Sequence, residues 1–203
     1  DYFDIIESTE KCYIVVGDIS GKGMAAALYM VRVQSIIHML LETLSGVKEI
    51  TISLKKYFSK NLRREYFLTL SMASVEKDGA IKICRAGHMP AYWFKNSSNE
   101  FEIICPQGLG IGLNDKGVFE KTLEEVTIKP ESKDIIFFFT DGISEAMNQH
   151  FQLFGEEYIK RIIKNNSGKS AEEIKRILLN AIIAFRGAAY QNDDITFVIL
   201  KAD

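Results

Sequence analysis

Hydrophobic residues recur every three or four positions in the early and the late part of the chain, and this period predicts helices there. Residues 24–44 contain no Gly or Pro, and they place Ile37 and Leu40 on one side and Ser35 and His38 on another. The pattern predicts one long amphipathic helix. Three further helices are predicted at residues 47–62, 154–163 and 171–185, the last opened by a capping box of Ser170 and Glu173.

The middle of the chain changes to an alternation of period two, which is typical of strands. Residues 67–75 and 81–84 flank Lys77-Asp78-Gly79, a sequence typical of a hairpin turn. Further strands are predicted at residues 12–16, 91–94, 101–104, 119–128, 134–139 and 195–200. Hairpins between two groups of helices predict an α+β fold, a four-layer α-β-β-α sandwich of two mainly antiparallel sheets flanked by helices. A doubly wound α/β fold is the alternative.

Composition is that of a folded globular protein: of the 203 residues, 47% are hydrophobic and 26% charged, with a formal net charge of -2. This balance gives no general attraction for phosphate backbones, so no nucleic acid partner is expected. The three cysteines form no C-x-x-C pair, which favours a reduced, cytoplasmic location. No purely apolar run approaches the ~20 residues of a spanning helix, so no membrane contact is expected of this segment.

The organisation of the chain predicts one domain over residues 1–203. No repeat, low-complexity tract or linker is evident, and Pro occurs at only three positions. The chain opens on Asp1 without an initiator Met, so we expect the domain to be cut from the C-terminal part of a longer protein. The full-length protein could be anchored in a membrane upstream of this segment.

Two glycine-rich stretches invite a nucleotide-binding interpretation, and both have the wrong spacing. Residues 17–23 are one residue short of the phosphate-binding loop and lack the Ser or Thr that would hold magnesium. Residues 108–112 alternate evenly, whereas a dinucleotide fingerprint needs a different glycine spacing at the start of a helix. The second stretch is therefore interpreted as a flexible loop between strands.

Aspartates fall at the ends of predicted strands. Asp18 ends a buried strand, Asp141 follows the apolar residues 135–139, and Asp193-Asp194 precede the last strand. A lone aspartate in such a place usually caps a turn. Several of them meeting at one sheet edge would repel each other unless divalent cations were bound.

Six short motifs stand in order along nearly the whole chain. They are Gly-Asp-Ile-Ser-Gly-Lys-Gly-Met-Ala-Ala-Ala-Leu (17–28), Ala-Gly-His-Met-Pro-Ala (86–91), Leu-Gly-Ile-Gly-Leu (109–113), Thr-Asp-Gly-Ile-Ser-Glu-Ala (140–146), Phe-Gly (154–155) and Asp-Asp-Ile-Thr (193–196). Each is modest alone. Together they resemble the SpoIIE-like bacterial branch of the metal-dependent serine/threonine phosphatases of type 2C, and this resemblance implies the sandwich fold of that family.

The resemblance implies a metal site made of oxygen ligands. Asp18 is similar to the catalytic aspartate that bridges two Mn²⁺ or Mg²⁺ ions, and Ile19 to the residue whose carbonyl binds one of them. Asp141 resembles the second-metal ligand of the Thr-Asp-Gly motif. Asp193 resembles the last aspartate ligand and is preferred to Asp194, the other candidate at this position. Oxygen ligands favour such hard ions over zinc.

Asp1 and His88 complete the candidate residues. Asp1 matches the acidic residue of the family's Gly-Gly-Asp-Tyr-Tyr-Asp opening beside the metals, although the two glycines and the strand before it are missing here. His88 is either a turn histidine that hydrogen-bonds backbone near Pro90 or a general acid for the leaving serine oxygen. His38 and His150 are interpreted as surface residues outside the site.

The implied activity is hydrolysis of phosphoserine or phosphothreonine on a regulatory protein, by a water that two divalent ions activate for in-line attack. The domain would be the cytoplasmic output module of a signalling protein with an upstream sensor domain, and its substrate would resemble a phosphorylated anti-anti-sigma factor. The alternative is a catalytically weak module of the same fold that docks partners through the helix at residues 24–44. A metal-dependent nuclease or nucleotidase is disfavoured because the sequence has no basic track.

Overall fold

The computed structural model describes residues 1–60, 66–113 and 117–203. They form two compact units, one of Asp1–His88 with Cys105–Lys129 and one of Met89–Ile104 with Pro130–Asp203. Each unit is an antiparallel sheet with helices packed against it. These two sheets confirm the predicted α+β class, and no strand pair among the described residues has the parallel order that a doubly wound fold requires.

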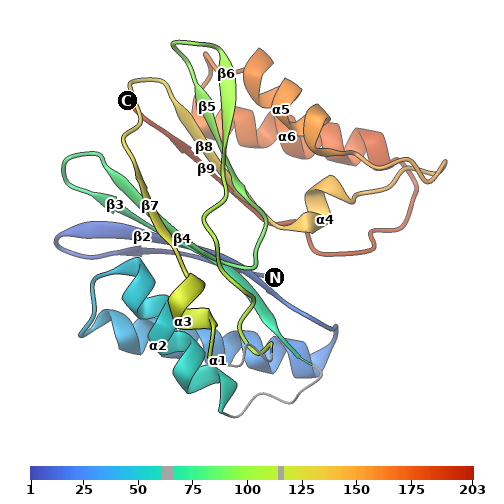
Figure 1. Ribbon diagram of the computed structural model, residues 1–203. Helices are drawn as coiled ribbons and strands as arrows, with labels where there is room; N and C mark the ends of the chain where they lie inside the picture. Colours follow the sequence, from blue (N-terminus) through green and yellow to red (C-terminus); the bar gives the residue numbers. More distant parts are fainter. Residues whose placement is uncertain (61–65, 114–116) are drawn as a thin grey trace. The chain divides into compact units, whose positions relative to one another are not determined.

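The first unit contains a five-stranded sheet in the order β1-β2-β3-β4-β7. Its strands are β1 (Tyr2–Glu7), β2 (Lys11–Ile19), β3 (Leu68–Glu76), β4 (Ile81–Ala86) and β7 (Glu125–Ile128). Three helices lie on one face of this sheet, α1 (Met24–Leu41), α2 (Val47–Ser59) and the single turn α3 (Phe119–Thr122) (Figure 1). The Lys77-Asp78-Gly79 turn joins β3 to β4 as predicted, with the Gly79 amide donating to the Glu76 carbonyl at 3.0 Å.

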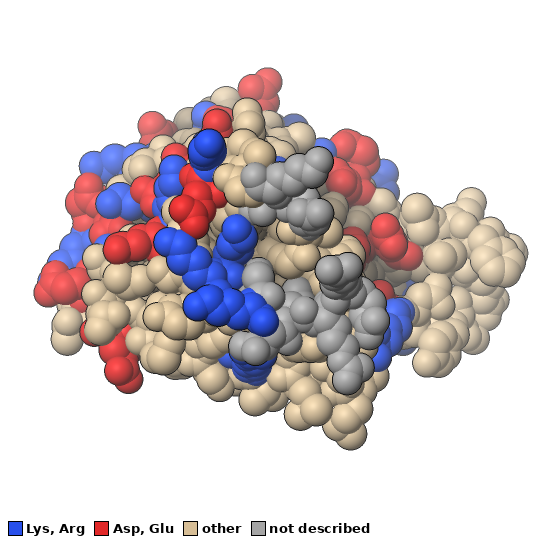
Figure 2. Space-filling view, turned by 60° about the horizontal axis from the view of Figure 1, so that its bottom comes forward, with Lys and Arg blue, Asp and Glu red and all other residues tan. Residues whose placement is uncertain are grey.

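Helix α1 exposes an unusual number of apolar side chains. By length and composition alone, α1 is apolar enough to cross a membrane, and 28% of it is buried. This is weak evidence for a membrane span, because core helices of soluble proteins pass the same test. Met24, Leu28 and Val31 are each at least 60% exposed. Figure 2, seen from the side of α1 and α2, shows Lys and Arg side chains gathered near the centre and uncharged side chains below them. The expected absence of membrane contact stays a prediction.

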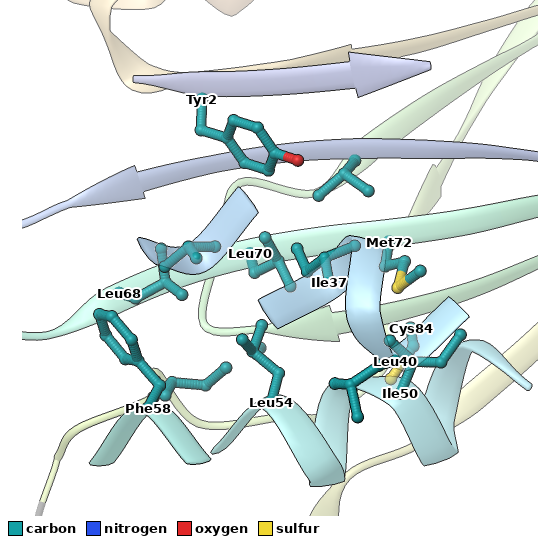
Figure 3. Close-up of a cluster of buried hydrophobic side chains, with 14 of the residues drawn as sticks. Tyr2, Ile37, Leu40, Ile50, Leu54, Phe58, Leu68, Leu70, Met72 and Cys84 are labelled. Atoms are coloured by element: carbon teal, nitrogen blue, oxygen red, sulfur yellow. The ribbon is translucent and has the colours of Figure 1, made fainter. Parts of the chain in front are cut away.

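The opposite face of α1 and one face of α2 are held to the sheet by a continuous apolar core. On β3, Leu68, Leu70 and Met72 point to the helices because side chains two positions apart share one face of a strand. The other main contributors, each less than 10% exposed, are Tyr2, Ile37, Leu40, Ile50, Leu54, Phe58 and Cys84 (Figure 3). Burying one Leu, Ile or Phe side chain contributes about 1.5–3 kcal/mol, so this layer fixes the helices firmly.

The second unit contains a four-stranded sheet in the order β6-β5-β8-β9. Its strands are β5 (Ala91–Lys95), β6 (Glu100–Ile104), β8 (Ile135–Phe139) and β9 (Phe197–Lys201). The short helix α4 (Asp141–Ser144) follows β8, and α5 (Glu156–Asn165) and α6 (Ala171–Arg186) pack against the sheet (Figure 1). The predicted capping box opens α6, where the Ser170 amide donates to Glu173 Oε2 at 3.0 Å and the Glu173 amide donates to Ser170 Oγ at 3.3 Å.

Several predicted boundaries are wrong. Residues 119–128 form α3 and then β7 instead of one strand, because Phe119 and Leu123, four positions apart, are both 1% exposed and define a helical turn. Strand β1 was not predicted. Strand β2 continues past Val16 to Ile19, and α1 ends at Leu41. Helix α2 ends at Ser59, and the rest of its predicted range, like most of the segment between α2 and β3, lies outside the described residues.

Residues 108–112 form a loop, as interpreted, with a single bridge at Ile111, and this loop is packed against the first sheet. Leu68 and Ile111 exchange two backbone hydrogen bonds of 2.8 Å, and Ile111 is fully buried. The Gly87 amide donates to the Gly108 carbonyl at 3.0 Å. The segment therefore extends the end of the first sheet near β3 and β4.

Asp134 is a buried anchor of the second unit, and its removal should be costly. The carboxylate, 1% exposed, accepts hydrogen bonds from Trp93 Nε1 at 2.9 Å and from the amides of Asn96 at 2.8 Å and Glu131 at 3.0 Å. Asp134→Ala would leave three donors without their acceptor, so we expect urea unfolding to show a loss of about 3 kcal/mol. Asp134→Asn keeps one acceptor oxygen and should lose less. An alanine variant as stable as the native chain would contradict the anchor.

Candidate functional site

In the first unit, the ladder between β1 and β2 brings Asp1 beside Asp18. Tyr2 pairs with Gly17, and the backbone nitrogen of Asp1 lies 3.7 Å from Asp18 Oδ1. On its other side Asp18 pairs with Thr69 of β3. The Asp18 backbone is held by its pairing with β3, one residue beyond the last pair between β1 and β2, and its side chain, 35% exposed, still reaches solvent.

Ile19 and Asp18 lie at the end of a strand and not in a turn. Ile19 pairs with Leu68, and its side chain is 3% exposed in the apolar core. Just beyond it the Ser20 amide donates to the Phe67 carbonyl, and the Phe67 amide donates to Ser20 Oγ, both at 2.8 Å. The Ile19 backbone is therefore fixed from both neighbours, which is what a carbonyl ligand requires.

His88 is linked to the Asp18 backbone through Thr69. The Thr69 hydroxyl lies 2.8 Å from His88 Nδ1 and 3.4 Å from the Asp18 carbonyl oxygen, to which it donates. Arg85 Nη1 donates to the His88 carbonyl at 2.7 Å, and the His88 side chain is 5% exposed. These contacts give His88 a structural role at the end of β2. Its role as a general acid stays a prediction.

His38 is an exposed surface residue, as interpreted, and it also makes a contact that the sequence did not predict. Its Nε2 lies 2.7 Å from Asp4 Oδ2, and the Tyr2 hydroxyl donates to the same oxygen at 3.0 Å. Burial acts to raise the pKa of the Asp4 carboxyl, but the hydrogen bonds from His38 and Tyr2 outweigh it and hold that pKa below its usual value. The contact joins α1 to β1 at a position three residues from Asp1. No local sequence pattern predicts it, because its partners are 34 positions apart.

In the second unit, Asp141 and the Asp193-Asp194 pair are brought together by close backbone contact. A Cβ built on Gly142 would lie 1.8 Å from the Asp194 carbonyl oxygen, so only glycine allows this approach. Beside it, the backbones of residues 140 and 196 are joined by an amide-to-carbonyl hydrogen bond of 3.0 Å. Asp141 is exposed at the start of α4, directly under the segment that precedes β9.

Asp193 and Asp194 are both exposed, in a segment with its own hydrogen bonds. The Asp194 amide donates to Asp193 Oδ1 at 3.0 Å, and Gln191 Nε2 donates to the Asp193 carbonyl at 2.9 Å. Arg186 Nη1 donates to Gln191 Oε1 at 2.8 Å, which connects this segment to the end of α6. The preference for Asp193 over Asp194 as a ligand stays a prediction.

The candidate ligands form two groups, one in each unit, and their donor atoms suit a hard divalent ion. Within residues 1–60, 66–113 and 117–203, no three His, Cys, Asp or Glu side chains lie close enough together to hold a metal ion. The candidates offer carboxylate and carbonyl oxygens, which Mg²⁺ and Mn²⁺ prefer. All three cysteines are free thiols. The donor set therefore fits the predicted metals, whereas the joining of both groups in one site stays a prediction.

Sequence comparison places the chain beside bacterial phosphatases. The family model of stage II sporulation protein E (SpoIIE) matches residues 8–203. Phosphoserine phosphatase RsbU of Bacillus subtilis is 24% identical over 205 residues, which are 99% of this chain and 58% of RsbU. The chain thus spans little more than half the length of this relative.

Solved structures of type 2C phosphatase domains share the fold. The SiaA-PP2C domain of Pseudomonas aeruginosa superposes with a TM-score of 0.84 over 100% of this chain and 80% of its own, at 16% identity. RsbX in complex with magnesium superposes with a TM-score of 0.72 over 100% of this chain and 86% of the RsbX chain, at 18% identity. The catalytic domain of PstP in complex with two manganese ions superposes with a TM-score of 0.64 over 99% of this chain and 91% of the PstP chain, at 11% identity. The chain therefore has the type 2C fold.

Gly142 provides a direct test of the contact between Asp141 and Asp194. Gly142→Ala would force the two backbones apart, so we expect a loss of about 2 kcal/mol in unfolding free energy and weaker Mn²⁺ binding by calorimetry. Gly168→Ala is the matched control, since a Cβ there meets no atom within 4 Å. The control should stay within about 0.5 kcal/mol of the native chain. Equal behaviour of the two variants would contradict the close contact.

The lowered pKa of Asp4 predicts a pH-dependent stabilisation. A carboxyl whose pKa is lower in the folded than in the unfolded chain stabilises the fold above its unfolded pKa of about 3.9, and this contribution is lost as pH falls through the folded pKa. Asp4→Asn should therefore reduce unfolding free energy by about 1 kcal/mol at pH 7, and the difference should shrink below about pH 4. A difference that is constant down to pH 3 would contradict this assignment.

Proposed function

The chain belongs to the SpoIIE family, and on that premise we propose that it is a metal-dependent protein serine/threonine phosphatase acting on a regulatory phosphoprotein. The observation that carries the proposal is the gathering of acidic residues at strand ends within each unit, Asp1 with Asp18 and Asp141 with Asp193-Asp194. Such like-charged groups are stabilised together by divalent cations.

The proposed site assigns one task to each residue. Two divalent ions, Mn²⁺ or Mg²⁺, would when bound lower the pKa of a shared water and neutralise charge on the phosphoryl oxygens. Asp18 would hold both ions, the Ile19 carbonyl would hold one of them, and Asp141 and Asp193 would hold the second. The ladder of β2 keeps Asp18 and Ile19 in place before any ion arrives, so binding need not order them.

Asp1 and His88 have supporting tasks in this proposal. Asp1 would add its carboxylate at the metals from the start of β1. Thr69 and His88 would hold the Asp18 backbone, and His88 would also donate a proton to the leaving serine oxygen. Asp194 would take the place of Asp193 as a metal ligand only if the segment before β9 changed the direction of its two carboxylates.

We propose that the substrate is a phosphorylated regulatory protein similar to an anti-anti-sigma factor. The similarity to phosphoserine phosphatase RsbU supports phosphoserine as the target. Residues 1–203 would act as one cytoplasmic domain of a longer signalling protein, under the control of an upstream sensor domain. The match of RsbU over 58% of its own length supports such a longer arrangement.

The activity can be tested by phosphate release from p-nitrophenyl phosphate and from a phosphoserine peptide, with Mn²⁺, with Mg²⁺ and with EDTA. We expect turnover that depends on the metal and falls more than about 100-fold in Asp18→Asn and in Asp141→Asn, because each removes a metal ligand. Asp78→Asn, an exposed carboxylate in the turn between β3 and β4, is the control and should keep native activity.

Turnover that survives both aspartate substitutions would overturn the ligand assignment. Absence of turnover with either ion, from a folded chain that still binds Mn²⁺, would favour the alternative of a docking module of the same fold. Binding of Mn²⁺ by calorimetry therefore accompanies every rate measurement.

A further inference from the structure

Beside the exposed face of α1 the first unit contains a cavity that none of the proposed metal ligands lines. Its volume is about 310 Å³, which is enough for one or two side chains of a bound peptide. Ala25 and Leu28 form an apolar floor, and the rings of Tyr29 and Tyr66 lie with their centroids 5.1 Å apart. Arg32 closes the cavity at its far end along α1.

Among the described residues that line this cavity, Arg32 is the charged one and none is acidic. Among the residues that the structure describes, its guanidinium makes no ion pair and no hydrogen bond. A guanidinium offers several N–H donors in a flat fork that matches a carboxylate, and it stacks well on tyrosine rings. An unpaired arginine next to aromatic and apolar groups is therefore suited to an acidic side chain that has an apolar neighbour.

The cavity lies next to the loop that follows Asp18 and Ile19, but Arg32 is too far along α1 to take part in the reaction. Tyr66 packs on the loop, since a Cβ built on Gly21 would lie 2.9 Å from its ring. Arg32 is eight residues after Met24, which corresponds to about 12 Å along the helix axis. An extended peptide covers that distance in about four residues. A chain bound in the cavity could thus reach the proposed metal ligands.

Helix α2, which packs beside α1, carries more basic than acidic residues. On α2 and at its end the described basic residues are Lys48, Lys55, Lys56 and Lys60, against the single acidic residue Glu49. Lys121 of α3 is exposed, as is Lys56 of α2, whose Nζ lies 3.6 Å from Glu120 Oε1. Figure 2 shows Lys and Arg side chains gathered on this side of the molecule. Since the whole chain has a net charge of -2, this basic area is a local feature and not a general property of the surface.

We propose that the cavity formed by Ala25, Leu28, Tyr29, Arg32 and Tyr66 is a docking site for the phosphoprotein substrate. It would bind a segment in which an acidic residue adjoins an apolar one, four or more residues from the phosphoserine. The acidic side chain pairs with Arg32, and the apolar one covers Leu28, which is 63% exposed in the free chain. Docking of a substrate presumes the phosphatase activity proposed above, so the test needs one measurement that is independent of turnover.

The test uses the 203-residue chain and two fluorescein-labelled phosphoserine peptides. One carries Leu-Glu pairs four to seven residues from the phosphoserine on both sides, and the other has every Glu replaced by Gln. Binding is measured by anisotropy in EDTA, and kcat/KM is measured with Mn²⁺. We expect the native chain to prefer the Glu peptide about tenfold, the effect of one charge-assisted pair. Arg32→Ala should reduce this preference to about twofold while hydrolysis of p-nitrophenyl phosphate is unchanged.

Two further variants separate docking from loss of structure. Arg32→Glu should reverse the preference when Lys replaces Glu in the peptide, a gain that a misfolded chain could not show. Lys129→Ala removes an exposed charge, 72% exposed, in the same unit and should leave all values unchanged. If Lys129→Ala reduced the peptide preference as much as Arg32→Ala does, the peptides would be responding to net charge alone, and the docking site would be overturned.

The remaining outcomes distinguish the two proposals. Equal binding of both peptides by the native chain would overturn docking. Loss of p-nitrophenyl phosphate hydrolysis in Arg32→Ala would also overturn it, because that result would place Arg32 at the phosphate. Preferential binding without turnover by any metal would support docking and overturn the phosphatase activity. A last outcome concerns phosphatidylglycerol vesicles. If the native chain sediments with the vesicles, Arg32→Ala does not, and the variant keeps the peptide preference, this face would be assigned to a membrane and docking would be overturned.

Discussion

Pairing of β2 on both of its edges is the constraint from which the rest of the first unit follows. Because β1 pairs with β2 up to Gly17 and β3 pairs with it through Ile19, the backbone at Asp18 and Ile19 has little freedom to relax away from neighbouring negative charge. Hydrogen bonds of the ladder and burial of Ile19 offset that repulsion. The same ladder aligns Leu68, Leu70 and Met72 for the helices, so the apolar core and the acidic strand end share one backbone framework.

Elements with a clear period and clear end signals were predictable from the sequence. Helix α6 has both, since an apolar residue recurs every third or fourth position and Ser170 and Glu173 cap its start. Strand β1 has neither. Phe3 and Ile5 are exposed while Tyr2 is buried, so apolar residues occupy both faces of this edge strand and the alternation disappears. Its place comes entirely from pairing with β2, a tertiary effect that single-sequence patterns do not contain.

The sequence predicts candidate residues for the site and not their contacts. Local motifs point to Asp18, Asp141 and Asp193, and their role as metal ligands stays a prediction. The contact between His38 and Asp4, and the packing of Gly142 on Asp194, join residues far apart in the chain. Only the folded backbone brings them together. Arg32 likewise gave no signal in the sequence, where it was one more polar residue on the outer side of a helix.

The contact of Gly142 with Asp194 also sets an order of events during synthesis. Some fifty residues separate the two positions, and β9, which anchors the later one, is the last strand of the described chain. A ribosome therefore releases Asp141 well before the segment that packs on it exists. During that interval the acidic groups of the second unit lie apart. A chain that ended before β9 would therefore lack the contact between Gly142 and Asp194.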